Sequence, residues 1–212
     1  MKRGFTLVEV LITIAILGIL AAMTLPQLLS NQFEDEIVNK LKKAHSTIAQ
    51  AVESASRTEG LVSDWGSNVN NVYAKISPQL RIIKTFNTSG TGCQNGGAFS
   101  DSWRSLTGNT VQNCMLNFSL ADGTAVGIKR ESNKAVFGVS NQLLSSNFIV
   151  FFVDLNGKSD PNVIGADIYA FVLTKKGIVP AGIDNTASCT ATGSNVGYNC
   201  AAKVLNEEKL AE

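Results

Sequence analysis

The first residue that could do chemistry is an acid in an apolar setting. Glu9 is the single charged residue between Phe5 and Leu25. A carboxylate in a membrane helix costs roughly 2.5 to 3.5 kcal/mol on insertion scales, so it needs a partner or a function. Cleavage after Gly4 would supply one, because Phe5 would then carry a free ammonium group on the same helix face as Glu9. The same pair could form between neighbouring copies, where an unpaired buried carboxylate would oppose wrong docking.

A second candidate is a cluster of oxygen-bearing side chains late in the chain. Oxygen donors at short spacing suit hard cations such as calcium. The match to a twelve-residue EF-hand loop is poor. If Asp154 is counted as the first position, Lys158 takes the fifth and Gly165 the twelfth, where that loop has oxygen ligands. The alternative is a turn in which Asp and Asn side chains cap their own backbone. We therefore carry a calcium site as a hypothesis, with Asp154, Asn156, Asp160 and Asp167 as its ligands.

The cysteines form a third set. No C-x-x-C pair occurs and His45 is the single histidine, so a structural zinc site is disfavoured. Four spaced cysteines suit two disulfides if the domain lies outside the cytoplasm, and three connectivities are open. Local bridges are favoured, since each pair brackets a Gly-, Asn- and Ser-rich stretch; four free buried thiols are the alternative. The favoured pairs are Cys93–Cys114 and Cys189–Cys200.

Catalysis finds no support in the sequence. It contains no G-x-S-x-G, no H-E-x-x-H and no phosphate-binding loop. His45 lies beside an apolar helical stripe, where a packed histidine is the simpler interpretation. The net charge of +1, without a dense basic run, gives no indication of nucleic-acid binding. We therefore expect a protein that is not an enzyme and has no established cofactor, with calcium left open.

The element that positions Glu9 is an N-terminal apolar helix. Residues 5–25 are long enough to cross a hydrocarbon core of roughly 30 Å. Lys2 and Arg3 precede the helix, which places the N-terminus in the cytoplasm and the rest of the chain outside. Two other interpretations exist: a secretory signal peptide cut near residues 20–22, or a simple signal anchor. Neither accounts for Glu9.

This N-terminus resembles the class III signal peptide of type IV pilins and type II secretion pseudopilins. The resemblance rests on Lys-Arg-Gly4 followed by Phe5-Thr-Leu-Val-Glu9, and covers about the first 30 residues. It implies cleavage between Gly4 and Phe5 by a prepilin peptidase, N-methylation of Phe5, and pairing of Glu9 with an adjacent subunit. Gly18 and Pro26 fall where such helices commonly bend.

Beyond residue 25 the composition becomes amphipathic. Residues 26–58 carry apolar side chains at helical spacing, which predicts a helix with one stripe against a globular domain. The stripe consists of Phe33, Ile37, Leu41, Ile48, Val52 and Ala55.

The remaining residues, 59–212, predict a β-rich head with a disulfide-bounded C-terminal loop. Residues 61–113 carry weak signals and suggest loops with short helical or extended pieces, in which Trp65 and Trp103 serve packing. A meander of four or five antiparallel strands should follow, beginning with a hairpin around Asp122-Gly123. The predicted strands are residues 115–120, 124–129, 135–139, 148–153, 167–174 and 178–180. The fold class is α+β, pilin-like, with the long helix packed on the sheet.

The sequence thus predicts a structural subunit of a type IV pilus or a type II secretion pseudopilus. Its expected partners are other pilin-like subunits, the prepilin peptidase and the inner membrane, crossed once. The alternative is a minor pilin that binds DNA or a secreted substrate. The sequence leaves open pilus against pseudopilus, major against minor subunit, the transported substrate and the disulfide connectivity.

Overall fold

The computed structural model describes residues 4, 6–86, 97–112, 115–140, 142–184, 189 and 197–210, with backbone alone for 25–31. Phe5, Cys93 and Cys114 therefore lie outside the described residues, as do Lys2 and Arg3. The chain divides into two compact units, residues 1–36 and 37–212, and each is described by itself.

The first unit contains the start of helix α1, which runs from Leu7 to Glu59. Its segment Leu7–Thr24 has a mean hydropathy of 2.4 and buries none of its residues. By length and composition this segment could cross a membrane, as the sequence predicts. The helix is continuous through Gly18 and Pro26, so a bend at either residue stays a prediction.

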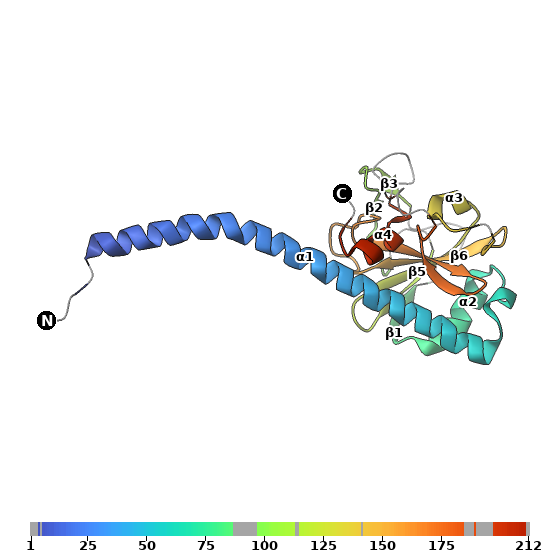
Figure 1. Cartoon of the computed structure of the whole chain (residues 1–212). Helices are drawn as coiled ribbons and strands as arrows, with labels where there is room; N and C mark the ends of the chain where they lie inside the picture. Colours follow the sequence, from blue (N-terminus) through green and yellow to red (C-terminus); the bar gives the residue numbers. More distant parts are fainter. Residues whose placement is uncertain are drawn as a thin grey trace. The chain divides into compact units, whose positions relative to one another are not determined.

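The second unit is built on an antiparallel sheet (Figure 1). Its six strands lie in the order β1-β4-β5-β6-β7-β8. A hairpin around Gly123, whose φ is 90°, joins β4 and β5 as expected. The strands are β1 (Ile82–Phe86), β4 (Leu116–Leu120), β5 (Ala125–Glu131), β6 (Phe148–Asp154), β7 (Ile168–Thr174) and β8 (Gly177–Pro180). A separate two-stranded sheet pairs β2 (Trp103–Arg104) with β3 (Thr110–Val111).

One face of the sheet packs against the amphipathic part of α1, which confirms the predicted α+β fold. Leu41, Ile48 and Val52 on the helix are buried in one cluster with inward residues of the strands, such as Phe151 and Phe171. Helix α4 (Cys200–Glu207) joins the same cluster. Alternate strand residues point to opposite faces, so this cluster uses one residue in two of β6 and β7.

The other face of the sheet is also covered. Val150 and Phe152 of β6 belong to a second buried cluster with Phe99, Trp103 and the short helix α3 (Lys134–Phe137). Because both faces are covered, β6 and β7 are buried at every position. This explains why β6 is a continuous apolar run, the feature that predicted a central strand.

One sequence-based prediction about a strand was wrong. Residues 135–139 were predicted as a strand, but Lys134–Phe137 form α3, which ends at Gly138 in the left-handed conformation. Phe137 is buried in the second cluster and stacks edge-on against Phe148, so tertiary packing overrides its β propensity. Strand β1 lies within residues 61–113, where only short extended pieces were expected, and it joins the sheet as an edge strand beside β4.

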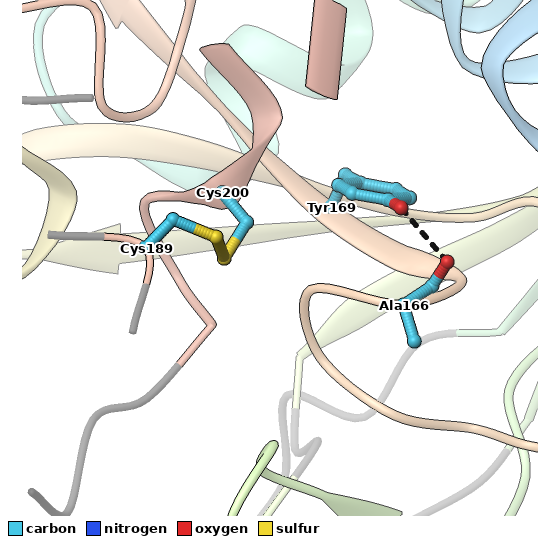
Figure 2. The surroundings of a disulfide bond; sticks show 4 residues. All are labelled: Ala166, Tyr169, Cys189 and Cys200. Atoms are coloured by element: carbon cyan, nitrogen blue, oxygen red, sulfur yellow. Dashed lines mark hydrogen bonds between the residues drawn. A yellow bond between two sulfur atoms is a disulfide. The ribbon is translucent and has the colours of Figure 1, made fainter. Parts of the chain in front are cut away.

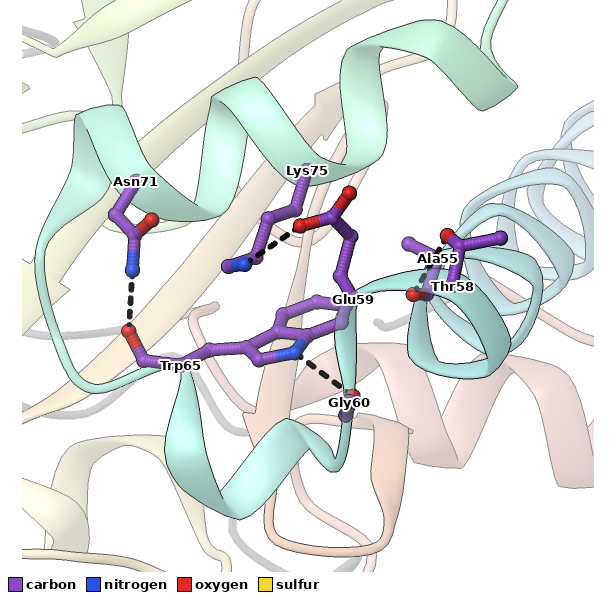
Figure 3. A network of polar contacts seen from close by, with 7 residues as sticks. All are labelled: Ala55, Thr58, Glu59, Gly60, Trp65, Asn71 and Lys75. Atoms are coloured by element: carbon purple, nitrogen blue, oxygen red, sulfur yellow. Dashed lines mark hydrogen bonds and ion pairs between the residues drawn. The ribbon is translucent and has the colours of Figure 1, made fainter.

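A polar network holds the end of α1 against the helix that follows (Figure 3). Gly60, with φ of 85°, ends the helix, and its carbonyl accepts a 3.0 Å hydrogen bond from Trp65 Nε1. Lys75 Nζ lies 2.9 Å from Glu59 Oε2, which links α1 to α2 (Val69–Ile76). Two 3-10 turns, η1 (Val62–Asp64) and η2 (Ser77–Gln79), flank α2.

Candidate functional site

Glu9 is satisfied by a local capping box at the start of α1. Its Oε2 accepts hydrogen bonds from Thr6 N at 2.8 Å and from Thr6 Oγ1 at 2.9 Å. Glu9 N in turn donates to Thr6 Oγ1 at 3.3 Å. This reciprocal Thr-x-x-Glu arrangement satisfies helix N–H groups that otherwise have no partner. The sequence interpretation missed Thr6, although the Thr-x-x-Glu spacing was visible.

The rest of this helix start is an apolar surface without a protein neighbour. Leu7, Leu17 and Met23 are 77%, 63% and 73% exposed. Such a surface on every side of a helix is stable only in lipid or against other apolar helices. Glu9 is the one acid within this surface.

The C-terminal disulfide is present as predicted: Cys189 and Cys200 are bonded, with Cα atoms 4.7 Å apart (Figure 2). Both residues are buried, and Cys200 begins α4. The disulfide therefore links the chain at Cys189 to the first residue of α4, a helix that is packed in the buried cluster. The other predicted pair, Cys93 and Cys114, falls outside the residues the structure describes.

The loop between β6 and β7 folds around Asp167. The Asp167 carboxylate accepts hydrogen bonds from Asn162 N at 2.9 Å and Val163 N at 2.7 Å. At the end of β6, Asp154 Oδ1 accepts from Asn156 N at 3.2 Å. Both carboxyl groups are fully or almost fully buried. Burial, and then the charge of Asp167, raises the pKa of Asp154 to about 8, and burial also raises the pKa of Asp167.

Three buried oxygens in this loop have no hydrogen-bond partner among the described residues: Asp154 Oδ2, Asn156 Oδ1 and Asn162 Oδ1. Asn162 was absent from the predicted ligand set, yet it is 3% exposed and adopts a φ of 52°. Asp160, which was in that set, is exposed, and its Oδ1 accepts from Asn162 Nδ2 at 3.2 Å. A signal for Asn162 was available in the sequence, because asparagine is one of the few side chains that tolerate this conformation.

Among the described residues, no group of three or more His, Cys, Asp and Glu side chains could hold a metal ion. A cation in the β6–β7 loop would therefore depend on amide oxygens as well as carboxylates. Amide and carboxylate oxygens without nitrogen or sulfur are ligands for hard cations.

His45 has a packing role in the structure. Its ring stacks on Phe171 with centroids 5.2 Å apart, and its buried Nε2 has no partner in the described part of the chain. Burial lowers the pKa of His45. The ring is therefore held in its neutral form at the interface between α1 and the sheet.

The comparisons with known proteins agree with this picture. Residues 1–25 match the family model "Prokaryotic N-terminal methylation motif". Over 173 residues the chain is 27% identical to a fimbrial protein of Dichelobacter nodosus. The aligned region covers 78% of this chain and 97% of that relative. No solved structure was found to match.

The fold defines a pilin-like α+β protein with an apolar N-terminal helix and an antiparallel sheet. The methylation motif and the similarity to a fimbrial protein support the assignment of this chain to the type IV pilin family.

Proposed function

We propose that this chain is a structural subunit of a type IV pilus or a type II secretion pseudopilus. The observation that carries the proposal is the segment Leu7–Thr24, an apolar helix with no buried residue and with Glu9 near its start. A surface of this kind needs lipid before assembly and neighbouring helices after it. The similar fimbrial protein adds support over most of the chain length.

In this proposal residues 1–4 are a leader that a prepilin peptidase removes by cutting between Gly4 and Phe5. Phe5 is then N-methylated, residues 5–25 anchor the chain in the inner membrane, and residues 26–58 form the amphipathic half of the helix. The head, residues 59–212, lies on the periplasmic or extracellular side. Bends at Gly18 and Pro26 would let neighbouring helices pack in the filament.

Glu9 sets the register of assembly in this proposal. In the unprocessed chain the carboxylate bonds to Thr6 alone among the described residues. A carboxylate oxygen can accept more than one hydrogen bond, so Glu9 can also accept from the new ammonium group of a neighbour. In a water-free helix bundle this ion pair would strongly favour the one register that forms it.

The N-terminal peptide of the protein from its own membranes tests the proposal by mass spectrometry. A chain that begins at methylated Phe5 is the expected result. An intact Met1 would identify a simple anchor, and a start near Met23 a secreted head. Either outcome would contradict the filament subunit.

A further inference from the structure

One side chain of the predicted amphipathic stripe is left uncovered by the core. Ile37, Leu41 and Ile48 of that stripe are 7%, 0% and 1% exposed, as expected for a helix face packed on the sheet. Phe33, one turn before Ile37, is 54% exposed. A large aromatic side chain gains free energy when a partner buries it, so Phe33 is a candidate contact residue.

Three acidic residues follow Phe33 directly: Glu34, Asp35 and Glu36. Their charges keep this turn of α1 out of the hydrocarbon core, so lipid tails do not cover the Phe33 ring. At roughly 100° per residue, Glu34 and Glu36 project on either side of Phe33, and Asp35 projects nearly opposite. This turn of α1 therefore presents an apolar ring between two carboxylates.

A groove on the second unit has the complementary chemistry. It encloses about 400 Å³ between α1, the segment before β1 and the β4–β5 turn. Leu80 and Leu120 contribute apolar lining, and Lys43 and Arg81 contribute two cations. Lys43 Nζ lies 2.8 Å from Asp122 Oδ2, whereas the exposed Arg81 has no ion pair among the described residues. The groove thus combines apolar surface with one uncompensated positive charge.

We propose that this groove receives Phe33 of a second copy of the chain, with Glu34 of that copy beside Arg81. The proposal rests on the filament function proposed above and adds a specific contact between subunits to it. Burial of the ring against Leu80 and Leu120 supplies the apolar contact. The opposite charges of Glu34 and Arg81 fix the orientation in which the ring enters.

A second copy is the occupant that the arrangement favours, because each chain carries both halves of the contact. The two halves are different surfaces, so the contact is heterologous: one copy's acidic turn enters the next copy's groove. Such a contact leaves an unused groove at one end and an unused turn at the other. It can therefore repeat along a filament.

Photo-crosslinking of the full-length chain in its own membranes and filaments tests the contact. Benzoylphenylalanine in place of Phe33 should give a product of twice the chain's mass. Mass spectrometry should place the attachment on the peptide that contains Leu80 and Arg81 or on the one that contains Leu120. Benzoylphenylalanine in place of Asp35, on the opposite side of the same turn, should give no attachment to these peptides.

Absence of the Phe33 product would overturn the proposal, as would attachment to another surface of the chain or to a different protein. The contact and the filament function can fail separately. Filaments without this product would overturn the contact alone. The product in membranes that never form filaments would overturn the filament function alone.

Charge reversal gives a second test, read from the amount of chain in sheared filaments. Arg81→Glu and Glu34→Arg should each lower that amount about five-fold or more, because each places like charges together. The double variant should return to within about two-fold of wild type, since the ion pair is restored with its signs exchanged. Lys175→Glu, which reverses an exposed lysine of the β7–β8 turn, should assemble normally. Normal assembly of both single variants, or losses that add in the double variant, would overturn the proposal.

Discussion

At the scale of single residues, two buried tryptophans differ in one hydrogen bond. Trp65 is 2% exposed and donates from Nε1 to the Gly60 carbonyl. Trp103 is 1% exposed, and its Nε1 has no partner within the described ranges. Comparing the two tryptophans therefore distinguishes the contribution of the indole ring to stability from the contribution of its N–H hydrogen bond.

Replacing each tryptophan by phenylalanine should reveal this difference. Trp65→Phe loses ring volume and leaves the Gly60 carbonyl without its indole donor. Trp103→Phe loses similar volume but also removes an unpaired buried donor. Trp65→Phe should be the more destabilising by about 1 to 2 kcal/mol in denaturant unfolding. Equal losses, or a larger loss for Trp103→Phe, would contradict the assignment of these bonds.

His45 should make the protein sensitive to mild acid. Burial lowers the pKa of His45 below the ordinary value of a histidine, so the unfolded chain binds the proton more readily than the folded one. Stability contributed by neutral His45 is present above the unfolded pKa and is lost as pH falls through the folded pKa. The loss should stay below about 1 kcal/mol, because the ring is only partly buried and its charge is partly screened by solvent.

Unfolding free energies between about pH 7.5 and pH 5.5 check this sign. The wild-type chain should lose more stability on acidification than His45→Leu, which cannot titrate and keeps an apolar contact with Phe171. Parallel pH profiles for the two chains would exclude His45 as the cause.

Glu9 should matter for assembly and not for membrane insertion. Glu9→Gln keeps a hydrogen-bonding side chain for Thr6 but cannot form an ion pair with a neighbour's ammonium group. We expect normal membrane levels and N-terminal processing, with filament incorporation reduced about ten-fold or more, since a desolvated ion pair is worth over 1.4 kcal/mol. Asp35→Asn, an exposed acid on the same helix, should assemble normally. Immunoblots of sheared filaments and membranes give both quantities.

At the scale of elements, α4 and the disulfide stabilise each other. Cys200, Ala201 and Val204 are buried in the cluster beneath α1. Lys42 on α1 also pairs with Glu208 just beyond α4, at 2.5 Å. The bridge thus connects the C-terminal loop to a helix that is already fixed to the core.

Removing the bridge should lower stability without changing the fold. The double variant Cys189→Ser, Cys200→Ser reopens a loop of 11 residues' separation. The loss should be about 2 to 3 kcal/mol in the chain-entropy account. Reducing agent should shift the wild-type midpoint in the same direction, and a double variant with an unchanged midpoint would show that α4 holds the loop alone.

At the scale of the whole molecule, the apolar segment and the core belong to different compact units. Ile37 and Val38 are the first buried residues among those side chains of α1 that the structure describes. Among the described residues, both buried clusters, one on each face of the sheet, consist of side chains of the second unit.

A chain that begins at Asp35 should therefore fold and stay soluble without detergent. The exposed apolar surface of Leu7–Thr24 is absent from it, while the buried stripe of α1 is complete. Gel filtration should give a monomer, and circular dichroism should show a cooperative transition. Aggregation, or a non-cooperative transition, would mean that residues before Asp35 contribute to the core.

The sequence by itself determined the apolar helix with Glu9, the amphipathic stripe and the central apolar strand, and it favoured the Cys189–Cys200 pair without excluding the other connectivities. The first three are local patterns of hydrophobicity and charge, which the chain carries before it folds. Only the tertiary structure decided that residues 134–137 form a helix, that β1 joins the sheet, and that Asn162 rather than Asp160 is buried in the β6–β7 loop. The first two depend on contacts between separate segments, Phe137 with Phe148 and β1 with β4, and the third on how the loop folds, with Asn162 N donating to Asp167. Such contacts leave little trace in local propensity, because burial against a distant partner outweighs the weak preference of a short segment.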